Sequence, residues 1–299
     1  MTTPNDSADR PPQRRSSRLQ GAIFLTLLSG LALAGTTQAP AALRRPAWKV
    51  YAIRYATIPG FPVHELVTGA DTSRTIDIAM MVWLLKGPGG RNVLVDAGFY
   101  RQKFLDAWKP AEYRRPSDAV QRLGVLPDSI TDIIISHVHW DHLDGADLFR
   151  NARVWMQREE YTYYVGENGA PLHAAIDTLD AAMLAELHRA GRVELIEGDG
   201  KEIIPGLTTY TGGKHTFASE YVGVRTANGT VVVASDNCYL YENLERHRPI
   251  AQTLDSTSNL AAQDRMRRIA SSVRLIVPGH DPKVFTRFRA AGVGAVSIR

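Results

Sequence analysis

Four of six consecutive residues can bind a metal ion: His137, His139, Asp141 and His142. They follow an apolar stretch, Ile130 to Ser136, that predicts a buried β-strand. Because side chains two residues apart leave a strand on the same side, the first two histidines can bind one ion together. The aspartate and the last histidine follow past a bend and can bind a second ion nearby. Neutral imidazole and carboxylate groups are ligands that zinc favours.

The elements that position these residues alternate along the chain. Apolar, β-branched or aromatic runs predict strands, with a hairpin turn at Asn228-Gly229, over Lys49–Ala56, Ile78–Lys86, Asn92–Asp96, Ile130–Ser136, Val193–Ile196, Leu207–Thr211, Tyr221–Thr226, Thr230–Ser235 and Arg274–Val277. Helices are predicted over Ser117–Leu123, capped by Ser117, over Ala174–Ala190 and over Gln263–Ser271. This alternation indicates one layered α/β domain.

Charge is unevenly distributed along the chain. Of 35 basic and 31 acidic residues, six arginines and two aspartates lie in residues 1–45, which leaves 29 of each sign in residues 46–299. A neutral body carries no electrostatic footprint for nucleic acid, so we expect no nucleic-acid partner.

Residues 1–41 are typical of an export signal peptide. An arginine-bearing stretch precedes an apolar run, Ala22–Ala34, and Ala39-Pro40-Ala41 fits the rule for cleavage after Ala41. We therefore expect residues 42–299 to be a periplasmic or secreted domain without stable membrane association, with an uncleaved anchor as the alternative. Arg14-Arg15 hints at the twin-arginine route, and the single cysteine, Cys238, permits no internal disulfide.

Five motifs resemble, in order, those of the metallo-β-lactamase superfamily. They are Leu94–Gly98, the HxHxDH stretch at 137–142, Thr211–Thr216, Val232–Asp236 and Ile276–His280. The third motif, TGGKHT, has one residue more than the usual TPGHT and lacks its proline. The resemblance implies a four-layer αββα metallo-β-lactamase fold with a single catalytic domain.

The resemblance also implies two divalent metal ions per chain, with zinc as the expected element. His137, His139 and His215 would bind one ion, Asp141, His142 and His280 the other, and Asp236 would bridge both. Asp96 would orient the histidine loop, although a strand-end turn would also explain an aspartate there. The remaining histidines, at positions 64, 173, 188 and 247, lie outside any motif and are expected in the surface or core.

Within this superfamily, Asp236-Asn237-Cys238-Tyr239 is similar to the N-acyl-homoserine lactonases, in which a tyrosine three residues after the bridging aspartate faces the substrate carbonyl. This implies hydrolysis of a small-molecule lactone or ester by a hydroxide held between the metals. Tyr239 would stabilise the oxyanion and Asp141 would protonate the leaving group. Substrate contacts are expected from Ile58–Val67 and from Tyr161, Tyr163 and Tyr164, unless these tyrosines are core residues. The sequence leaves open whether the chain forms a homodimer.

Three alternatives remain at this point. A phosphotriesterase or phosphodiesterase would use the same metals. A glyoxalase-II-like thioesterase would need basic residues for glutathione, for which Lys283, Arg287 and Arg289 are candidates. A non-catalytic metal-binding protein would be expected to lack some ligands, and none of the seven is missing.

Overall fold

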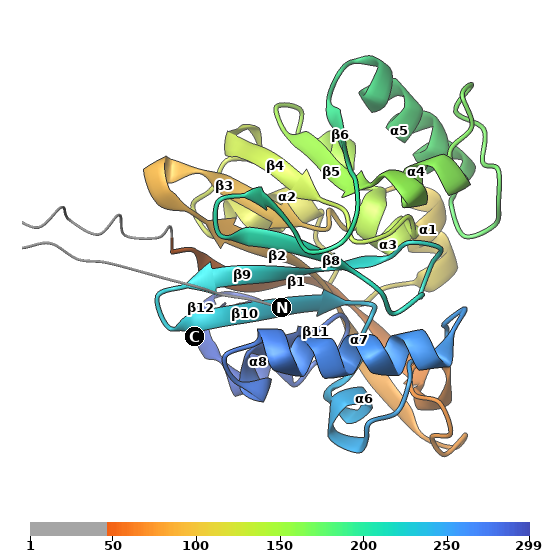
Figure 1. The fold of residues 1–299 in the computed structure, drawn as a ribbon, viewed down its shortest axis with the longest axis vertical. Coiled ribbons are helices and arrows are strands. Elements are labelled where there is room, and N and C mark those ends of the chain that lie inside the picture. The colour runs from red at the N-terminus through yellow and green to blue at the C-terminus, as the bar shows by residue number, and fades with distance from the viewer. Residues whose placement is uncertain (1–46) are drawn as a thin grey trace, which may run out of the picture. The chain divides into compact units, whose positions relative to one another are not determined.

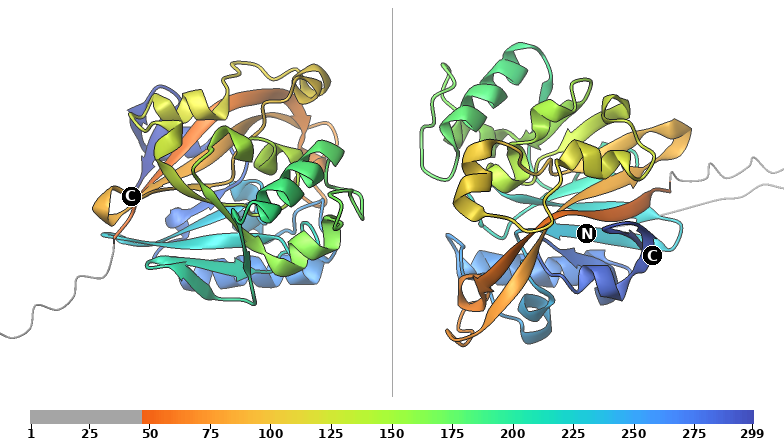
Figure 2. Two further views of the ribbon diagram at one scale, coloured as in Figure 1. Left: turned by 90° about the horizontal axis from the view of Figure 1, so that it is seen from above. Right: turned by 180° about the vertical axis from the view of Figure 1, so that it is seen from behind.

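Two β-sheets lie face to face in the computed structural model, which describes residues 47–299, and helices cover the outer faces of both sheets (Figures 1 and 2). Three layers of apolar side chains fill the spaces between these elements. The predicted four-layer αββα fold with a single domain is therefore confirmed.

The larger sheet contains β1 (Lys49–Pro62), β2 (Thr75–Lys86), β3 (Asn92–Val95), β4 (Ile130–Ile134), β5 (Arg153–Gln157), β6 (Val193–Ile196), β12 (Arg289–Gly292) and β13 (Ala295–Ile298). Its strand order is β12-β13-β1-β2-β3-β4-β5-β6. The smaller sheet contains β7 (Lys201–Ile204), β8 (Leu207–Thr211), β9 (Glu220–Thr226), β10 (Gly229–Ser235) and β11 (Ile276–Pro278). Its order is β11-β10-β9-β8-β7.

The helices divide between the two outer faces. The larger sheet is covered by α1 (Gln102–Trp108), α2 (Pro116–Gln121), α3 (Trp140–Leu143), α4 (Arg158–Tyr164) and α5 (Thr178–Arg189). The smaller sheet is covered by α6 (Tyr241–Arg246) and α7 (Ser256–Ile269), and the short α8 (Val284–Arg287) lies beside β12 and β13. In Figure 1, α7 crosses the smaller sheet below β10.

Alternation along β10 illustrates why the sheets pack. Val231 and Val233 point between the sheets, where they join Trp83 of β2 in one buried cluster. Val232 points to the other side and packs with Met266 of α7. Because successive side chains in a strand face opposite ways, an all-apolar strand must be covered on both faces, and here a sheet and a helix cover it.

The strand directions determine where the candidate metal ligands meet. β3, β4, β5 and β6 run parallel to one another, and β10 runs parallel to β11. The carboxyl ends of β3, β4, β10 and β11 therefore lie at one edge of the sandwich, and each is followed by a segment that carries site residues. This is the edge at which open α/β sheets place their ligand sites.

Three predicted helix starts are wrong. Ser117 does not cap α2, which begins at Pro116 after an Arg115 that makes no side-chain capping bond, because proline's fixed φ suits the first helical position. α5 begins at Thr178 behind Asp177 rather than at position 174. α7 begins at Ser256 rather than at position 263, because Asp255 accepts hydrogen bonds from the amides of the first turn.

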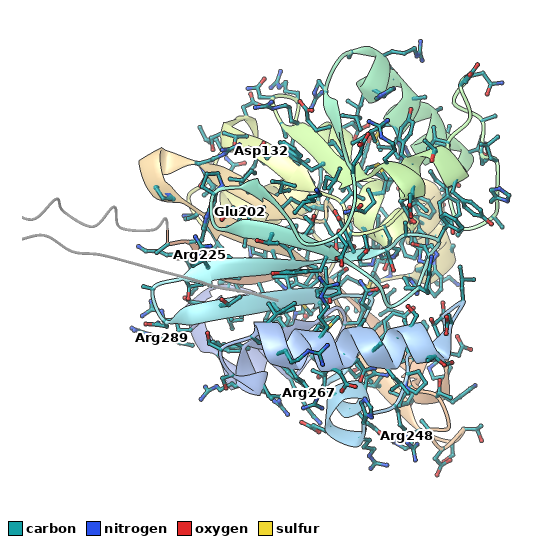
Figure 3. The ribbon with its side chains drawn as sticks, viewed as in Figure 1. Asp132, Glu202, Arg225, Arg248, Arg267 and Arg289 are labelled. Carbon is teal, nitrogen blue, oxygen red and sulfur yellow. The ribbon has the colours of Figure 1, made fainter. Side chains whose placement is uncertain are left out.

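Four strands were not predicted: β5, β7, β12 and β13. In β4, the buried Asp132 (labelled in Figure 3) accepts hydrogen bonds from Arg91 (2.9 Å) and from the indole of Trp155 in β5 (2.9 Å), which links the two strands. The predicted signal peptide, residues 1–41, lies outside the described residues. Between residues 47 and 299, no helix has both the length and the apolar character needed to cross a membrane.

Candidate metal centre

All seven predicted metal ligands come together at the strand ends. One group of possible ligand atoms belongs to His137, His139, His215 and Asp236, and the other to Asp141, His142, Asp236 and His280. Within each group every ligand atom lies within 4.8 Å of the others, and Asp236 belongs to both. The predicted division into two groups with one shared carboxylate is therefore present in the structure.

The first group is built around three imidazole nitrogens. Nδ1 of His139 lies 3.1 Å from Nε2 of His137 and 2.8 Å from Nε2 of His215. Oδ2 of Asp236 lies 3.7 Å and 3.5 Å from these two Nε2 atoms. Three nitrogens and one carboxylate oxygen around a common point match the coordination that zinc adopts in proteins.

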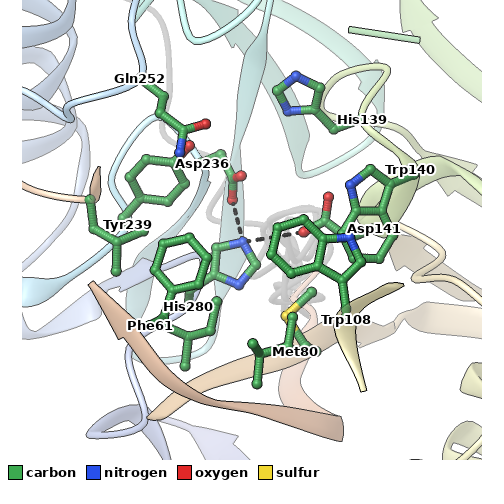
Figure 4. A pocket seen from close by; sticks show the side chains of 13 residues that line it. Phe61, Met80, Trp108, His139, Trp140, Asp141, Asp236, Tyr239, Gln252 and His280 are labelled. Carbon is green, nitrogen blue, oxygen red and sulfur yellow. Dashed lines mark ion pairs between the residues drawn. The ribbon is translucent and has the colours of Figure 1, made fainter. Parts of the chain in front are cut away.

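The second group lies on the other side of Asp236. Nε2 of His142 is 3.2 Å from Oδ2 of Asp236 and 3.3 Å from Oδ2 of Asp141. Nε2 of His280 is 3.0 Å from Oδ1 of Asp236 and 3.6 Å from Oδ2 of Asp141 (Figure 4). Oδ2 of Asp236 thus lies near histidines of both groups, as a carboxylate shared between two metal sites requires, and Oδ1 faces His280.

Acceptors outside the cluster orient three of the histidines. The Nδ1 atoms of His215 and His280 donate to the main-chain oxygens of Gln252 (2.8 Å) and Ala79 (3.1 Å). Nδ1 of His142 donates to Oδ2 of Asp96, 2.8 Å away. In the neutral form of each ring, the other nitrogen, Nε2, is unprotonated and faces the cluster, and this is the form that binds a metal.

The surroundings keep two histidines of the first group uncharged. Burial, followed by the neighbouring His142, lowers the pKa of His137 well below its ordinary value. Burial, followed by the neighbouring His215, lowers the pKa of His139 to about 3. Both rings are therefore neutral near pH 7 and can act as metal ligands.

Two buried polar atoms indicate that the cluster suits a metal ion. Nε2 of His142 and Oδ1 of Asp236 have no hydrogen-bond partner among the described residues, although each faces the cluster. A buried polar atom without a partner costs free energy of about 1–3 kcal/mol. A divalent cation at this position would satisfy both atoms, so the residues present fit the metals expected from the motifs.

The loop before His215 reaches the cluster by an unusual backbone path. Gly212, Gly213 and Lys214 all have positive φ, at 121°, 98° and 47°. A Cβ atom on Gly213 would lie 2.2 Å from Oδ1 of Asn237, so only glycine fits there. The additional residue in TGGKHT is accommodated by this left-handed stretch, and His215 still occupies the position expected of it.

Asp96 lies behind the ligands. Its carboxylate accepts hydrogen bonds from Nδ1 of His142 (2.8 Å), from the amide of Ser136 (2.8 Å) and from the hydroxyl of Ser235 (2.8 Å). It thereby connects the ends of β4 and β10 to a histidine of the second group. The predicted contact between Asp96 and the histidine loop is present, and the alternative of a simple turn residue is unnecessary.

Tyr239 is buried and lines the pocket over the cluster. Its hydroxyl oxygen lies 3.3 Å from Nδ1 of His215. Because that nitrogen already carries the proton donated to Gln252, the tyrosine oxygen can only accept from it. Burial, followed by the charge of Asp236, raises the pKa of Tyr239 well above its ordinary value, so the hydroxyl keeps a proton for another acceptor.

A cavity of about 170 Å³ opens over the cluster. Its walls are mainly apolar and its floor holds the candidate ligands (Figure 4); the lining residues are Ile58, Phe61, Leu66, Ile78, Met80, Trp108, His139, Trp140, Asp141, Asp236, Tyr239, Gln252 and His280. Ile58, Phe61 and Leu66, from the segment expected to contact the substrate, line this cavity.

Part of this lining was not predicted. The indole rings of Trp108 and Trp140 stack with centroids 5.2 Å apart and planes at 17°. Trp140 lies inside the HxHxDH motif, which could have identified it as a pocket residue. Trp108 and Met80 come from α1 and β2, and no local pattern in the sequence connects them with the cluster.

Two other groups of side chains lie away from the cluster. Tyr161 and Tyr164 belong to the core and Tyr163 packs against it, and none of the three lines the cavity, so the alternative that these tyrosines are core residues is the one the structure shows. The remaining histidines join neither ligand group, as expected from the sequence. For example, His173 stacks on Tyr163 at 3.9 Å and His247 pairs with Asp264 at 3.1 Å.

Comparison with known proteins agrees with this fold and site. The Metallo-beta-lactamase superfamily matches residues 80–280. An N-acyl homoserine lactonase of Bacillus thuringiensis is 31% identical over 235 residues, which cover 73% of this chain and 88% of that protein. A solved quorum-quenching N-acyl homoserine lactone lactonase aligns with a TM-score of 0.65 at 24% identity, over 81% of this chain and 95% of that one. AidC, described as a dizinc quorum-quenching lactonase, aligns at 0.58 and 16% identity, over 80% and 90%.

The fold and the histidine–aspartate cluster define a hydrolase that binds divalent metal. More specifically, the chain belongs to the metallo-β-lactamase superfamily, since the family match spans residues 80–280 and contains the HxHxDH motif, His215, Asp236 and His280.

Proposed function

We propose that this protein hydrolyses the ring ester of lactones of the N-acyl-homoserine-lactone type, using two zinc ions. Identity of 31% with a lactonase over most of both chains supports the reaction class. The two overlapping ligand groups support a pair of metal ions. Ring opening consumes one water, breaks the bond between the carbonyl carbon and the ring oxygen, and yields an acyl amino acid with a free hydroxyl group.

The observation that carries this proposal is the contrast between the walls and the floor of the cavity. Phe61, Leu66 and Met80 line the walls, whereas Asp141, Asp236 and His280 lie at the floor. A substrate with a hydrolysable polar head and an apolar acyl chain matches both surfaces at once. Packing of the acyl chain against the apolar walls removes its surface from water and stabilises binding, while the polar head reaches the metal ligands at the floor.

The charge of the lining favours a neutral substrate. None of the described lining residues is lysine or arginine. An anionic phosphodiester or a glutathione thioester would be expected to need such a partner. The candidate basic residues for glutathione are absent from the lining, and Arg287 pairs instead with Glu245 at 2.6 Å. Arg225, Arg248 and Arg289 also lie at the periphery (Figure 3). A neutral phosphotriester remains the alternative to be tested.

The two ligand groups would each hold one zinc ion, with Asp236 shared. When bound, the ions would supply Lewis acidity and lower the pKa of water from about 15.7 towards 7. His137, His139 and His215 contribute no charge of their own, so they preserve the full positive charge of the ion they hold.

Two side chains are assigned to the reacting groups. Tyr239 donates its hydroxyl proton in a hydrogen bond to the carbonyl oxygen as negative charge develops there. Asp141 lies at the cavity floor, where its carboxylate can take a proton from the attacking water and pass it to the departing ring oxygen. Its main-chain oxygen accepts a hydrogen bond from Tyr55 (3.2 Å), which holds the segment that carries this carboxylate.

A substrate panel tests the proposal. The zinc-loaded protein is assayed with acyl-homoserine lactones, aryl esters, a neutral phosphotriester and S-lactoylglutathione. We expect the highest kcat/KM for a lactone with an apolar acyl chain. A higher value for the phosphotriester or for the glutathione thioester would contradict the assignment and favour the corresponding alternative.

A further inference from the structure

Glu160 is a buried side chain that no step of the proposed reaction uses. It lies in the first turn of α4 and is 1% exposed. Its Oε1 atom accepts hydrogen bonds from the amide of Val138 (3.2 Å) and the hydroxyl of Thr216 (2.6 Å). Its Oε2 atom accepts one from the amide of Ala218 (2.7 Å). A carboxylate so deeply buried needs such partners, and here all of them come from two other segments.

These donors belong to the segments that carry the first ligand group. Val138 lies between His137 and His139, and Thr216 directly follows His215. The two segments are 76 positions apart in the chain where His139 meets His215. Glu160 therefore connects the two segments directly, and it lies behind the three histidine nitrogens of the first ligand group. None of its three donors lies in the segment around His280.

We propose that Glu160 is the positioning residue that holds the two histidine segments of the first metal site together. The inference rests on the proposed two-metal function. Partners behind metal ligands fix the direction of those ligands, and their loss weakens metal binding by about tenfold to a hundredfold. Glu160 acts on the main chain on both sides of the site, so its loss affects how the segments approach one another.

Glutamine cannot replace Glu160 in this arrangement. A carboxylate offers two accepting oxygens, whereas an amide offers one oxygen and one NH₂ group. If the glutamine oxygen faces Val138 and Thr216, its NH₂ group meets the amide of Ala218. If it is turned around, the NH₂ group meets the amide of Val138. Either orientation leaves at least one buried main-chain N–H without an acceptor.

The test measures zinc affinity and uses the neighbouring Glu159→Gln as a matched control. Glu159 is exposed, and its carboxylate makes no hydrogen bond or ion pair within residues 47–299. Burial raises the pKa of Glu160 to about 7, so measurements at pH 8 examine its ionised form. Stepwise dissociation constants are obtained by chelator competition. For Glu160→Gln we expect one constant to rise about tenfold to a hundredfold and the other to stay within about threefold.

Thr216→Val provides a milder second variant. It removes one of the three donors and keeps the volume, so one dissociation constant should rise about twofold to tenfold. If Glu160→Gln does not fold, the zinc dissociation constants of Thr216→Val test the positioning role instead. Unchanged constants in the folded variants, or equal rises in both constants, would overturn the positioning role. These affinities do not depend on the substrate, so a protein that fails on lactones would leave this inference standing.

Discussion

Nδ1 of His142 lies 2.8 Å from Oδ2 of Asp96, which is fully buried at the end of β3. The same carboxylate binds the amide of Ser136 and the hydroxyl of Ser235. Asp96 therefore fixes the direction of a second-group histidine and connects it to the ends of strands from both sheets. Its backbone has a φ of 59°, a conformation that aspartate tolerates better than most residues.

We expect Asp96→Asn to weaken binding of one zinc ion by about tenfold to a hundredfold. The asparagine keeps the shape but loses one accepting oxygen, so either His142 or Ser136 loses its acceptor. Chelator competition measures the change. Asp106→Asn is the control, because Asp106 is exposed on α1, belongs to neither ligand group and accepts its side-chain hydrogen bond from Gln102. Wild-type affinity for both ions in Asp96→Asn would refute this role.

The purified protein should carry about two metal ions per chain. Asp236→Ala should lower occupancy of both sites, because Asp236 belongs to both ligand groups. His280→Ala should chiefly weaken one site, since His280 belongs to one group. Elemental analysis after zinc reconstitution measures the ratio. Fewer than one ion per chain in the unmodified protein would rule out a two-metal centre.

Tyr239→Phe should lower kcat on lactones by about tenfold to a hundredfold. This loss is no greater than the one expected for a sole oxyanion donor, because a metal ion would also stabilise the oxyanion. Metal content should be unchanged, because Tyr239 belongs to neither ligand group. Steady-state kinetics and elemental analysis on the same sample separate the two effects. A change confined to KM would indicate ground-state binding instead, and full kcat on every lactone would show that the hydroxyl has no part in catalysis.

Export should remove residues 1–41, so the mature chain should begin at Ala42. Small residues are needed at the cleavage site, so Ala41→Asp should block processing. N-terminal sequencing of protein recovered from the periplasm or the medium measures the start. Replacement of Arg14 and Arg15 by lysine should slow export only if the twin-arginine route is used. An intact N-terminus in a cytoplasmic fraction would contradict the proposed location.

Only part of the ligand cluster could be predicted from local geometry, because the strand before His137 directs two histidines to one side. The ligands distant in sequence, His215, Asp236 and His280, were expected from the resemblance of their motifs to those of the superfamily, and the fold brings them to the same edge. The cavity walls could not be predicted in this way. Trp108 lies in α1 and Met80 in β2, and they meet over the cluster only because the sheet and its covering helix pack together.

Other features depend on contacts that the apolar pattern does not show. For Tyr161 and Tyr164 the sequence left both a core position and substrate contact open, because only the tertiary structure decides between core and cavity, and α4 places both side chains in the core. α7 begins at Ser256, seven residues before the predicted start, because the carboxylate of Asp255 accepts hydrogen bonds from the amides of the first turn. Glu160 resembles any glutamate in a first helical turn, and its contacts depend on segments distant in sequence.

The most direct test of the account is the rate of ring opening of N-hexanoyl-homoserine lactone as zinc is added stepwise to the metal-free protein. We expect negligible kcat without metal and full kcat as the zinc content approaches two ions per chain. Product is identified as the ring-opened acyl homoserine by mass. Full hydrolysis without zinc, or no hydrolysis of the lactone by protein that holds two zinc ions, would contradict the central claim.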